Sequence, residues 1–529
     1  MLFNIFSKSK QKKSLAARWG VEKAIPLNFY QIEKYHLKRD FSNVFQVISP
    51  QTRNDIDFES LFGFVDRTSC AIGQQYLYDK LLTIEKNPCF LEQEKSIKAL
   101  VSNENIRLDI QLILSKLQNT NAYDVCGLFL DPVLPKPKRF FITKVQSLLS
   151  ILSFCLIFIN VYFIFPFVAF TISNIFIHYS NKKYIQLYSG AMHQLVKMCK
   201  CAKALSKLWV LKDQEDILQP SLKSLNSINQ TWSIFDTQIQ GSPELTEFIW
   251  IILEYIKICF LIEPIIFFHT LGKLAKRKNE IKIVYEFIGQ VDCYFSIASL
   301  RVSLPYYCLP SFKNENETSV EIKDVFHPLI KNSVSNSISV KDKSVLLTGS
   351  NMSGKTAFLR TIAINMIFAQ TINTCFAKFL STPPIKIFTV INISDNLLEG
   401  KSYFFEEMLR IKEIVTQSQR SSTNLFVLDE VYKGTNTTER VAAVKAVLQF
   451  ISQGNIVFAS THDFELATLL DSCFACYYFT EIIENNNLLF DYKLKLGSLK
   501  YGNAIKILEI NGYPTEITEM ANSMIEKKS

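Results

Sequence analysis

The order of hydrophobic and polar positions divides the chain into a helical first part and a mixed second part. Over residues 55–82, apolar side chains recur every three or four positions, the spacing of one face of an α-helix. A similar pattern extends to about residue 119 and resumes over residues 183–300. After Pro310, short β-branched runs alternate with helical stretches, which is typical of an α/β domain.

The most apolar stretch, residues 145–177, separates the two helical regions and contains no charged residue. A membrane-spanning helix needs about 20 predominantly apolar residues. Basic residues flank the stretch on both sides, namely Lys138, Arg139, Lys144, Lys182 and Lys183. Because positive charge marks the cytoplasmic side of a span, both ends are predicted to be cytoplasmic, which requires an even number of crossings. We therefore expect a hairpin that turns near residues 160–166.

Two alternatives to a spanning hairpin stay open. Each arm would hold only about 16 residues, slightly fewer than the usual ~17–25, so the hairpin could be re-entrant or partly inserted. It could also be a buried core hairpin of a soluble domain. Residues 248–271 are apolar as well, but Glu254, Lys257, Glu263 and Pro264 interrupt them. Since charges are costly at the centre of a bilayer, we interpret this segment as a core or interfacial helix rather than a third span.

Length and composition narrow the class of protein. A chain of 529 residues is too long to form a single ordinary hydrophobic core, so two or more domains are expected. Hydrophobic residues make up 48% of the chain and charged residues 20%, a composition that excludes a disordered chain. The net charge of +9 is compatible with an anionic partner, either nucleic acid or an acidic lipid surface, and does not distinguish between them. The pair Cys473 and Cys476 lacks a second pair to complete a zinc site, so reduced cytosolic cysteines are expected. The basic N-terminus is not followed by an apolar segment, and no secretory signal is expected.

A glycine-rich loop between a predicted strand, residues 345–348, and a predicted helix carries the strongest chemical signal. Residues 349–356 read GSNMSGKT and fit the phosphate-loop pattern GxxxxGK[ST]. Its glycines let backbone N–H groups surround phosphate oxygens, and the following helix N-terminus adds a favourable dipole. Lys355 would bring charge to the β- and γ-phosphates, and the Thr356 hydroxyl would bind Mg²⁺. The predicted nucleotide-binding residues of the loop are Gly349, Ser350, Asn351, Met352, Ser353, Gly354, Lys355 and Thr356.

Two further predicted strands end in residues that suit the same chemistry. Residues 424–429 form an apolar run that ends in Asp429 and Glu430. Asp429 is expected to hold Mg²⁺ together with Thr356, and Glu430 to act as the general base on the attacking water. Residues 455–460 form another buried run, followed by His462. A lone histidine is usually structural, but at the carboxyl end of a strand beside the phosphate loop we expect it to sense the γ-phosphate. The predicted catalytic set is therefore Glu430, His462 and Lys355.

These motifs together resemble those of the MutS family. TGSNMSGKT looks like the family's TGPNMGGKST, LDEVYKGTNTTE resembles LDEIGRGTSTYD, and Thr461-His462 resembles its ATH. Residues 395–408, DNLLEGKSYFFEEM, resemble DDLASGRSTFMVEM, whose serine reaches the nucleotide of the partner subunit; the matching residue is Ser402. His327-Pro328 stands where the family has RHP. The resemblance covers roughly residue 325 to the end, and residues 57–82 resemble the start of the family's helical core more weakly.

The resemblance implies a fold class and a domain order. A C-terminal α/β P-loop NTPase domain of the ABC type is expected over residues 321–529. An all-α core and lever domain, residues 51–320, would precede it, interrupted by the apolar hairpin at 145–177 and led by residues 1–50. The family also implies ATP with Mg²⁺ as cofactors, a head-to-tail dimer, and DNA bound without sequence preference.

Departures from the family pattern separate two hypotheses. Phe58-x-Ser60 lacks the glutamate of the family's Phe-x-Glu wedge, and neither a mismatch-reading domain nor a C-terminal nuclease domain is expected. The apolar hairpin falls within the core and lever region, where mismatch-repair proteins have none. The chain resembles a membrane-associated branch of the family with both termini and the ATPase domain cytoplasmic. It is either a DNA-binding clamp tethered at the membrane or a membrane-bound mechanochemical ATPase that has lost DNA recognition.

Overall fold

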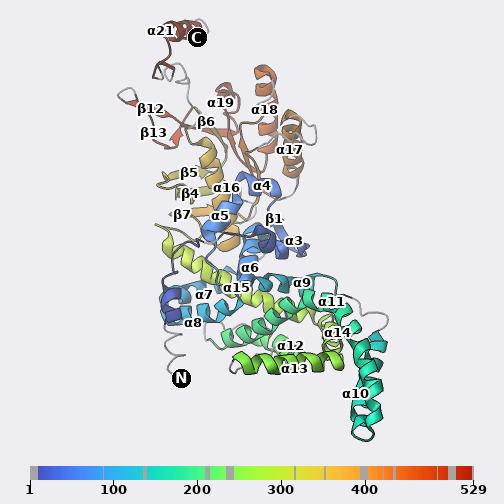
Figure 1. Ribbon diagram of the computed structural model, residues 1–529. Helices are drawn as coiled ribbons and strands as arrows, with labels where there is room; N and C mark the ends of the chain where they lie inside the picture. Colours follow the sequence, from blue (N-terminus) through green and yellow to red (C-terminus); the bar gives the residue numbers. More distant parts are fainter. Residues whose placement is uncertain are drawn as a thin grey trace. The chain divides into compact units, whose positions relative to one another are not determined.

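The computed structural model arranges the chain in two compact units made of interleaved segments. It describes residues 10–24, 26–86, 88–134, 140–208, 215–233, 243–314, 317–350, 353–392, 403–420, 422–432, 436–484, 487–498, 508–510 and 512–526. Unit 1 comprises Met1–Asp40, Asp66–Asp79 and Leu91–Val302. Unit 2 comprises Phe41–Val65, Lys80–Phe90 and Ser303–Ser529. The colours of Figure 1 follow these segments along the sequence.

A six-stranded, mostly parallel sheet forms the centre of unit 2. Its strand order is β14-β11-β6-β10-β9-β8, and only β14 runs antiparallel. The strands are β6 (Ser344–Gly349), β8 (Lys386–Val390), β9 (Asn424–Asp429), β10 (Ile456–Ser460), β11 (Phe474–Phe479) and β14 (Lys495–Leu496). Every residue of β6 and β10 is buried, as expected for parallel strands covered on both faces. The strands expected from the sequence at residues 345–348, 424–429 and 455–460 are confirmed.

Helices cover both faces of this sheet (Figure 1). They are α16 (Lys355–Ile372), α17 (Tyr403–Ser418), α18 (Thr437–Ile451) and α19 (Glu465–Leu469). Ile411, Val444 and Leu466 from the last three helices share one core cluster with Phe426 and Leu428 of β9. Successive side chains of a strand alternate between faces, so Leu425 and Val427 of β9 face the opposite side, where α16 packs.

Smaller elements complete unit 2. A second sheet has the order β3-β7-β4-β5, and two antiparallel pairs join β12 with β13 and β1 with β2. The strands are β1 (Val44–Val47), β2 (Thr83–Glu85), β3 (Ser311–Phe312), β4 (Val320–Val325), β5 (Asn336–Val340), β7 (Phe379–Thr382), β12 (Glu481–Glu484) and β13 (Asn487–Phe490). The helices are α4 (Pro50–Asp55), α5 (Phe58–Val65) and α21 (Thr515–Glu526).

Hydrogen bonds tie residues 41–65 to the edge strand β8. Gln46 exchanges two bonds with the backbone of Ile387, at 2.7 and 2.8 Å. The buried carboxylate of Asp55 accepts from the Thr389 hydroxyl at 2.6 Å and from the Asn392 amide at 2.9 Å. The sequence pattern assigned these residues to the lead-in and the helical region, whereas their contacts place them in unit 2. The division into domains at residues 50 and 320 stays a prediction.

Unit 1 is helical in the part that the structure describes. Its elements are α2 (Phe29–Ile32), α3 (Lys34–Lys38), α6 (Ala71–Leu82), α7 (Phe90–Ser102), α8 (Glu104–Leu114), η1 (Ser115–Leu117), η2 (Thr120–Cys126), α9 (Gly127–Leu130), α10 (Phe140–Ile157), η3 (Val161–Phe163), α11 (Ile164–Leu205), α12 (Glu215–Ser233), α13 (Pro243–Cys259), α14 (Ile262–Leu274) and α15 (Lys278–Ser303). The periodic pattern over residues 55–82 is therefore realised as two helices, α5 and α6, separated by residues 66–70.

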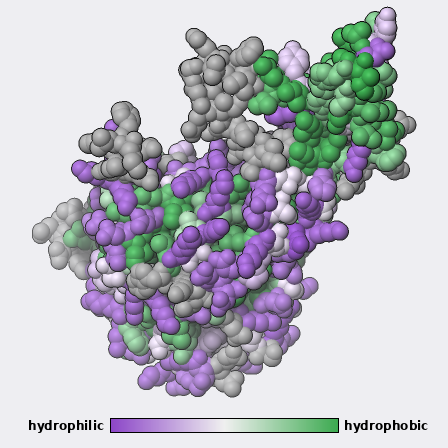
Figure 2. Space-filling model, turned by 90° about the horizontal axis from the view of Figure 1, so that it is seen from below, coloured by the Kyte–Doolittle hydropathy of each residue, from purple (hydrophilic) through white to green (hydrophobic). Residues whose placement is uncertain are grey.

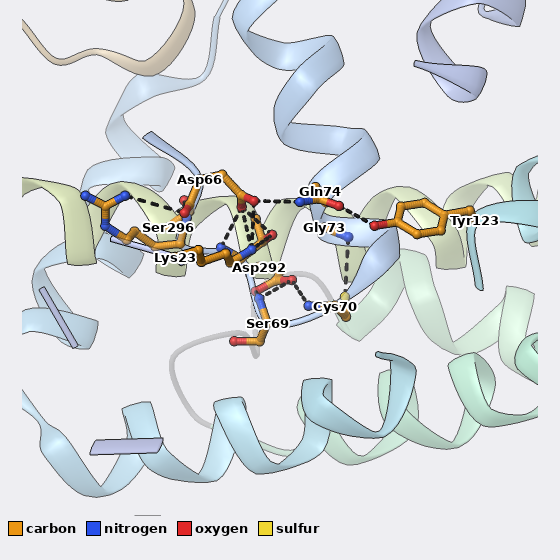
Figure 3. Close-up of polar contacts among 11 residues, drawn as sticks. Lys23, Asp66, Ser69, Cys70, Gly73, Gln74, Tyr123, Asp292 and Ser296 are labelled. Atoms are coloured by element: carbon orange, nitrogen blue, oxygen red, sulfur yellow. Dashed lines mark hydrogen bonds and ion pairs between the residues drawn. The ribbon is translucent and has the colours of Figure 1, made fainter. Parts of the chain in front are cut away.

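A buried acidic residue of α15 fixes the start of α6 (Figure 3). The Asp292 carboxylate accepts from the backbone amides of Ser69 at 2.7 Å and Cys70 at 2.9 Å. These amides belong to the beginning of the helix, which has no carbonyl partners for its first N–H groups. The approach requires Gly73, because a Cβ there would lie 2.0 Å from Asp292 Oδ2. This contact joins segments more than two hundred residues apart in sequence.

The apolar stretch forms a helical hairpin whose surface is largely exposed. Helix α10 ends at Ile157, and the chain turns through η3, where the Asn160 side chain accepts from the Tyr162 amide at 3.0 Å. The turn thus falls inside the expected interval of residues 160–166. The second arm does not end at residue 177 but continues as the long helix α11. Figure 2 shows hydrophobic residues gathered on the projecting end that carries α10.

The apolar segment at 248–271 is two helices rather than the single helix expected. Helix α13 ends at Cys259, α14 begins at Ile262, and Leu261 between them has a φ of 51°. The hairpin supplies donors to carbonyl groups at this break. Ser150 and Asn174 donate to Cys259 O at 2.8 and 2.6 Å. Ser147 donates to Phe260 O at 2.6 Å.

Candidate functional site

The loop between β6 and α16 has the backbone that a phosphate loop needs. Gly349 and Gly354 have φ values of 144° and 107°, in the region that favours glycine. A Cβ at Gly349 would lie 2.5 Å from the carbonyl oxygen of Phe479, and one at Gly354 would lie 3.1 Å from the Tyr492 ring. The two glycines therefore let the loop turn closely over the end of β6 and point the start of α16 at the site.

Lys355 is held inside the turn of this loop. Its side chain is buried, and Nζ donates to the carbonyl oxygens of Gly349 at 2.8 Å and Ser350 at 2.7 Å. Ser353 also closes the turn, because its hydroxyl donates to Ser350 O at 2.8 Å. Asn351 and Met352, which the sequence also assigns to the nucleotide, lie outside the described residues.

A hydroxyl and a carboxylate from neighbouring strands and loops meet beside Lys355. The Thr356 hydroxyl donates to Asp429 Oδ2 at 2.6 Å. The Ser460 hydroxyl contacts the other oxygen of the same carboxylate. Asp429 and Ser460 pair directly across the parallel strands β9 and β10, so sheet register alone brings them together. The predicted metal pair Thr356 and Asp429 thus lies in contact, and Ser460 was missed in the sequence.

The two predicted catalytic residues after the strands also meet. His462 Nε2 lies 2.6 Å from Glu430 Oε1. Glu430 has a φ of 49°, and its amide donates to Ser460 O at 3.2 Å, which turns the chain directly after β9. The glutamate side chain is mostly buried, and the imidazole is partly exposed. A carboxylate near the loop with a histidine against it is an arrangement suited to orienting a water molecule.

Other side chains at the site were missed because they come from distant segments. The Tyr432 amide donates to Glu407 Oε1 at 2.5 Å, which fixes the turn after Glu430. Ser350 donates to Glu481 Oε2 at 2.5 Å, which ties the phosphate loop to β12. Glu407 lies in the family-like segment 395–408, where only Ser402 was singled out, and Glu481 lies in none of the quoted motifs. Ser402, expected to reach a partner subunit, lies outside the described residues.

A cavity of about 310 Å³ opens beside the loop and the start of α16. Its walls are mainly apolar and aromatic, with a few polar groups, which is the usual lining of a site for a planar organic group. Lining residues include His327, Ile330, Val334, Phe358, Phe479 and Tyr492. Because the cavity adjoins Gly354, a nucleoside bound there would have its phosphates at the loop.

His327, which follows β4, is buried as a neutral imidazole. Its Nδ1 accepts from the Leu329 amide at 3.3 Å, so the other ring nitrogen carries the proton in the neutral ring. Burial, and to a lesser extent the positive charge of Arg360, lowers the pKa of His327 to about 4. His327 therefore binds its proton near pH 6.5 in the unfolded chain but only at a lower pH in the folded chain.

We expect this histidine to make the fold acid-sensitive. Between about pH 6.5 and pH 4 the unfolded state binds more protons, so stability falls as pH falls, by on the order of 3 kcal/mol over the window. His327→Asn keeps an acceptor for the Leu329 amide without the titrating ring. Urea unfolding at pH 7 and pH 5 should show that the free energy of unfolding falls less in the variant than in the wild type. Equal losses in the two proteins would assign the acid sensitivity to other groups.

The described residues fit a magnesium-bound nucleoside triphosphate. Lys355 offers a buried cation whose Nζ donates to two carbonyl oxygens of the loop. The Thr356 hydroxyl and the Asp429 carboxylate are oxygen ligands of the kind Mg²⁺ prefers, and they already lie in contact. The glycines permit the tight turn of the loop, because a Cβ at either position would press against Phe479 O or the Tyr492 ring. The side chains and the loop backbone therefore suit the same ligand, a magnesium-bound nucleoside triphosphate.

Comparison with known proteins shows what this region is similar to. Residues 345–528 match the model of MutS domain V. DNA mismatch repair protein MutS from Lactococcus lactis subsp. cremoris (strain SK11) is 29% identical over 301 residues, 54% of this chain and 35% of that protein. The corresponding protein from Leptospira interrogans (strain Fiocruz L1-130) is 30% identical over 300 residues, with the same two coverages. That from Methanococcoides burtonii is 25% identical over 303 residues, 54% of this chain and 33% of that protein.

The chain spans about a third of the length of these relatives. The family match confirms the expected fold class, a P-loop ATPase region of the MutS domain V type preceded by a largely helical region. It also agrees with the geometry, since the matched range begins in β6 and includes the phosphate loop, Asp429, Glu430 and His462.

Proposed function

From the match of residues 345–528 to MutS domain V, we propose that this chain binds and hydrolyses ATP with Mg²⁺. One observation carries the proposal: the phosphate loop, the Thr356–Asp429 contact and the Glu430–His462 contact all lie at the carboxyl ends of adjacent parallel strands. Ligands bind at this edge in open α/β sheets. The meeting of these three features at one edge of the sheet supports the proposed nucleotide site.

Each side chain has a role in the proposed reaction. Lys355 neutralises charge on the β- and γ-phosphates, and the loop amides hold the phosphate oxygens. Glu430 accepts a proton from the water that attacks the γ-phosphorus, while His462 positions the glutamate and responds to the γ-phosphate. Mg²⁺, bound by Thr356 and Asp429, supplies further neutralisation of the developing charge. Ser460 keeps the Asp429 carboxylate oriented toward the loop.

We further propose a head-to-tail dimer in which Ser402 completes the site of the partner. The basis is the resemblance of residues 395–408 to the family's segment. The relatives are named as mismatch repair proteins, and we infer their activities for this chain only from sequence similarity. ATP would close the dimer, and hydrolysis would open it.

A subunit-mixing experiment tests the shared site. Lys355→Ala subunits and Ser402→Ala subunits should each have little activity alone, because each homodimer has two defective sites. In a mixed dimer one site receives both native residues, so mixing at equal amounts should restore up to about half of the wild-type rate per heterodimer. Phosphate release across mixing ratios measures this. A flat, inactive profile at every ratio would indicate a site complete within one chain.

We propose that the helical unit tethers the chain at a membrane through the α10–α11 hairpin. Two helices are long and apolar enough to cross a bilayer, over Phe140–Ile157 and Val161–Leu205. Only 22% and 11% of their most apolar windows are buried. The core helix of a soluble protein would be mostly buried, so this exposure favours lipid as the surrounding medium. Both termini and the ATPase region would be cytoplasmic, where ATP is available.

DNA is the proposed second ligand, and loss of DNA binding is the competing hypothesis. Clamp-type binding through Lys and Arg contacts to phosphates predicts an affinity that falls linearly with salt on logarithmic axes and is the same for matched and mismatched duplexes. Titration of the full chain in detergent with a labelled duplex at several salt concentrations measures this. No binding at the lowest salt concentration would favour a membrane-bound mechanochemical ATPase without DNA recognition.

A further inference from the structure

Three side chains of metal-ligating type meet in the helical unit, away from the nucleotide site. His178 comes from α11, Glu254 from α13 and Glu263 from the first turn of α14. One ligand atom of each lies within 4.8 Å of the other two. His178 Nε2 lies 3.6 Å from Glu263 Oε2, beyond normal hydrogen-bond length. Three separate helices therefore direct a nitrogen and two oxygens to one point.

His178 is the member of this cluster that local structure does not explain. Its side chain is 0% exposed, and within the described part of the chain neither ring nitrogen has a hydrogen-bond partner. Leaving a buried polar group without a partner costs about 1–3 kcal/mol. The two carboxylates have local roles, since Glu263 lies at a helix N-terminus and Glu254 is 3.5 Å from Lys257 on its own helix. The imidazole has no such role, yet it faces both of them.

We propose that His178, Glu254 and Glu263 bind a divalent transition-metal ion of the zinc type. A metal would accept the Nε2 lone pair, which satisfies the imidazole, and would neutralise two partly buried carboxylates. Mixed imidazole and carboxylate ligands suit Zn²⁺, Mn²⁺, Fe²⁺ or Co²⁺, whereas Ca²⁺ and Mg²⁺ prefer oxygen alone. Three protein ligands leave a fourth position for water.

The ligand atoms need a small closure to bind the ion. Ligands about 2.0 Å from a tetrahedral zinc are about 3.3 Å apart, closer than the present 4.8 Å limit. Both glutamate side chains are about a quarter exposed, at 26% for Glu254 and 23% for Glu263, so they have room to rotate. His178 is fully buried and has less room to move than the glutamates, so it would set the position of the ion.

The position of the site indicates what the ion would do. The two glutamates lie on either side of the break at Cys259–Leu261, and His178 lies one helical turn beyond Asn174, which caps that break. The ion would join α11, which continues the apolar hairpin, to α13 and α14. The proposed role is thus a clamp that holds the hairpin against the broken helix, independent of nucleotide.

Metal binding to the full chain in mild detergent tests the site. After chelator treatment and without nucleotide, the wild type dialysed against Zn²⁺ should retain one ion per chain that His178→Ala does not. We expect His178→Ala to weaken binding at least about 100-fold, at or beyond the 10–100-fold effect of outer-shell changes, and Glu263→Gln to weaken it about 10-fold. His193→Ala, in the same helix but outside the cluster, is the matched control and should bind as the wild type does.

Two further readouts separate this site from other metal-binding groups and from misfolding. Co²⁺ should give a spectrum without a thiolate charge-transfer band, which excludes the cysteines, and Zn²⁺ should raise the Tm of the wild type more than that of Glu263→Gln. Equal zinc content in wild type and His178→Ala would overturn the proposal, as would a wild type that binds no zinc. If His178 is instead protonated and paired only with Glu263, the wild type should bind no zinc.

Discussion

Replacing Glu430 by glutamine is expected to slow ATP hydrolysis by about 10²–10⁴-fold, the usual contribution of a general base. The amide cannot accept the proton of the attacking water, whereas Lys355, Thr356 and Asp429 stay in place. Binding of Mg-ATP should therefore persist. The variant should accumulate ATP on the protein, because the step after binding is the one removed.

Single-turnover hydrolysis and equilibrium binding of Mg-ATP measure the two halves of this prediction. Glu465→Gln is the matched control, since that glutamate is exposed and lies three residues after His462 in the sequence. It should hydrolyse ATP at the wild-type rate. A Glu430→Gln protein that turns over as fast as the wild type would exclude Glu430 as the base.

The second large effect concerns the apolar hairpin, which should keep the protein in the membrane fraction through salt and alkaline washes. Large apolar side chains are exposed along both arms and the turn, including Phe141, Leu148, Leu152, Phe158, Ile159, Phe165, Ile172 and Phe176. Each contributes about 1.5–3 kcal/mol when fully removed from water, so together they favour lipid over water by many powers of ten.

Deleting residues 145–177 and joining the ends by a short flexible linker should release a soluble chain that still hydrolyses ATP. The deletion removes Ser150 and Asn174, but water can then reach the Cys259 carbonyl that they occupy. Fractionation of both proteins, with phosphate release from each, measures the effect. A buried core hairpin predicts the reverse, with the intact chain soluble at low salt and the deletion unfolded.

Protease accessibility in sealed vesicles tests the hairpin against a single crossing. With an even number of crossings, tags at the N-terminus and C-terminus should be cleaved together from the cytoplasmic side. Protection of one tag would require an odd number of crossings. That result would contradict the basic flanks on both sides of the apolar stretch.

Local sequence predicted the part of the site that depends on local structure. The phosphate loop follows directly from residues 349–356, and the strand-ending Asp429 and Glu430 from the apolar run before them. Ser460 was missed because a serine at a strand end carries no signal until the register of β9 and β10 places it opposite Asp429. Glu407 and Glu481 were missed for the same reason, since only tertiary structure brings Glu407 to the turn after Glu430 and Glu481 to the phosphate loop.

The fold was predicted less completely where distant segments pack together. Residues 41–65 have a helical or irregular pattern, and nothing in it indicates that Gln46 and Asp55 bind the edge strand β8. Likewise, the apolar run at 248–271 continues through Leu261, a residue type that gives no sign of the left-handed turn dividing α13 from α14. Donors from the hairpin bind carbonyl groups at that break, so its cause lies outside the segment.

We expect the phosphate loop and the strand-end carboxylates to form a working ATPase. Its most direct test is phosphate release from Mg-ATP by the purified full chain, compared with Lys355→Ala at equal concentration. We predict steady turnover by the wild type that stops when Mg²⁺ is chelated, and no turnover above background by Lys355→Ala, because the phosphate charge is then unopposed. Equal phosphate release by the two proteins, with or without Mg²⁺, would contradict the account.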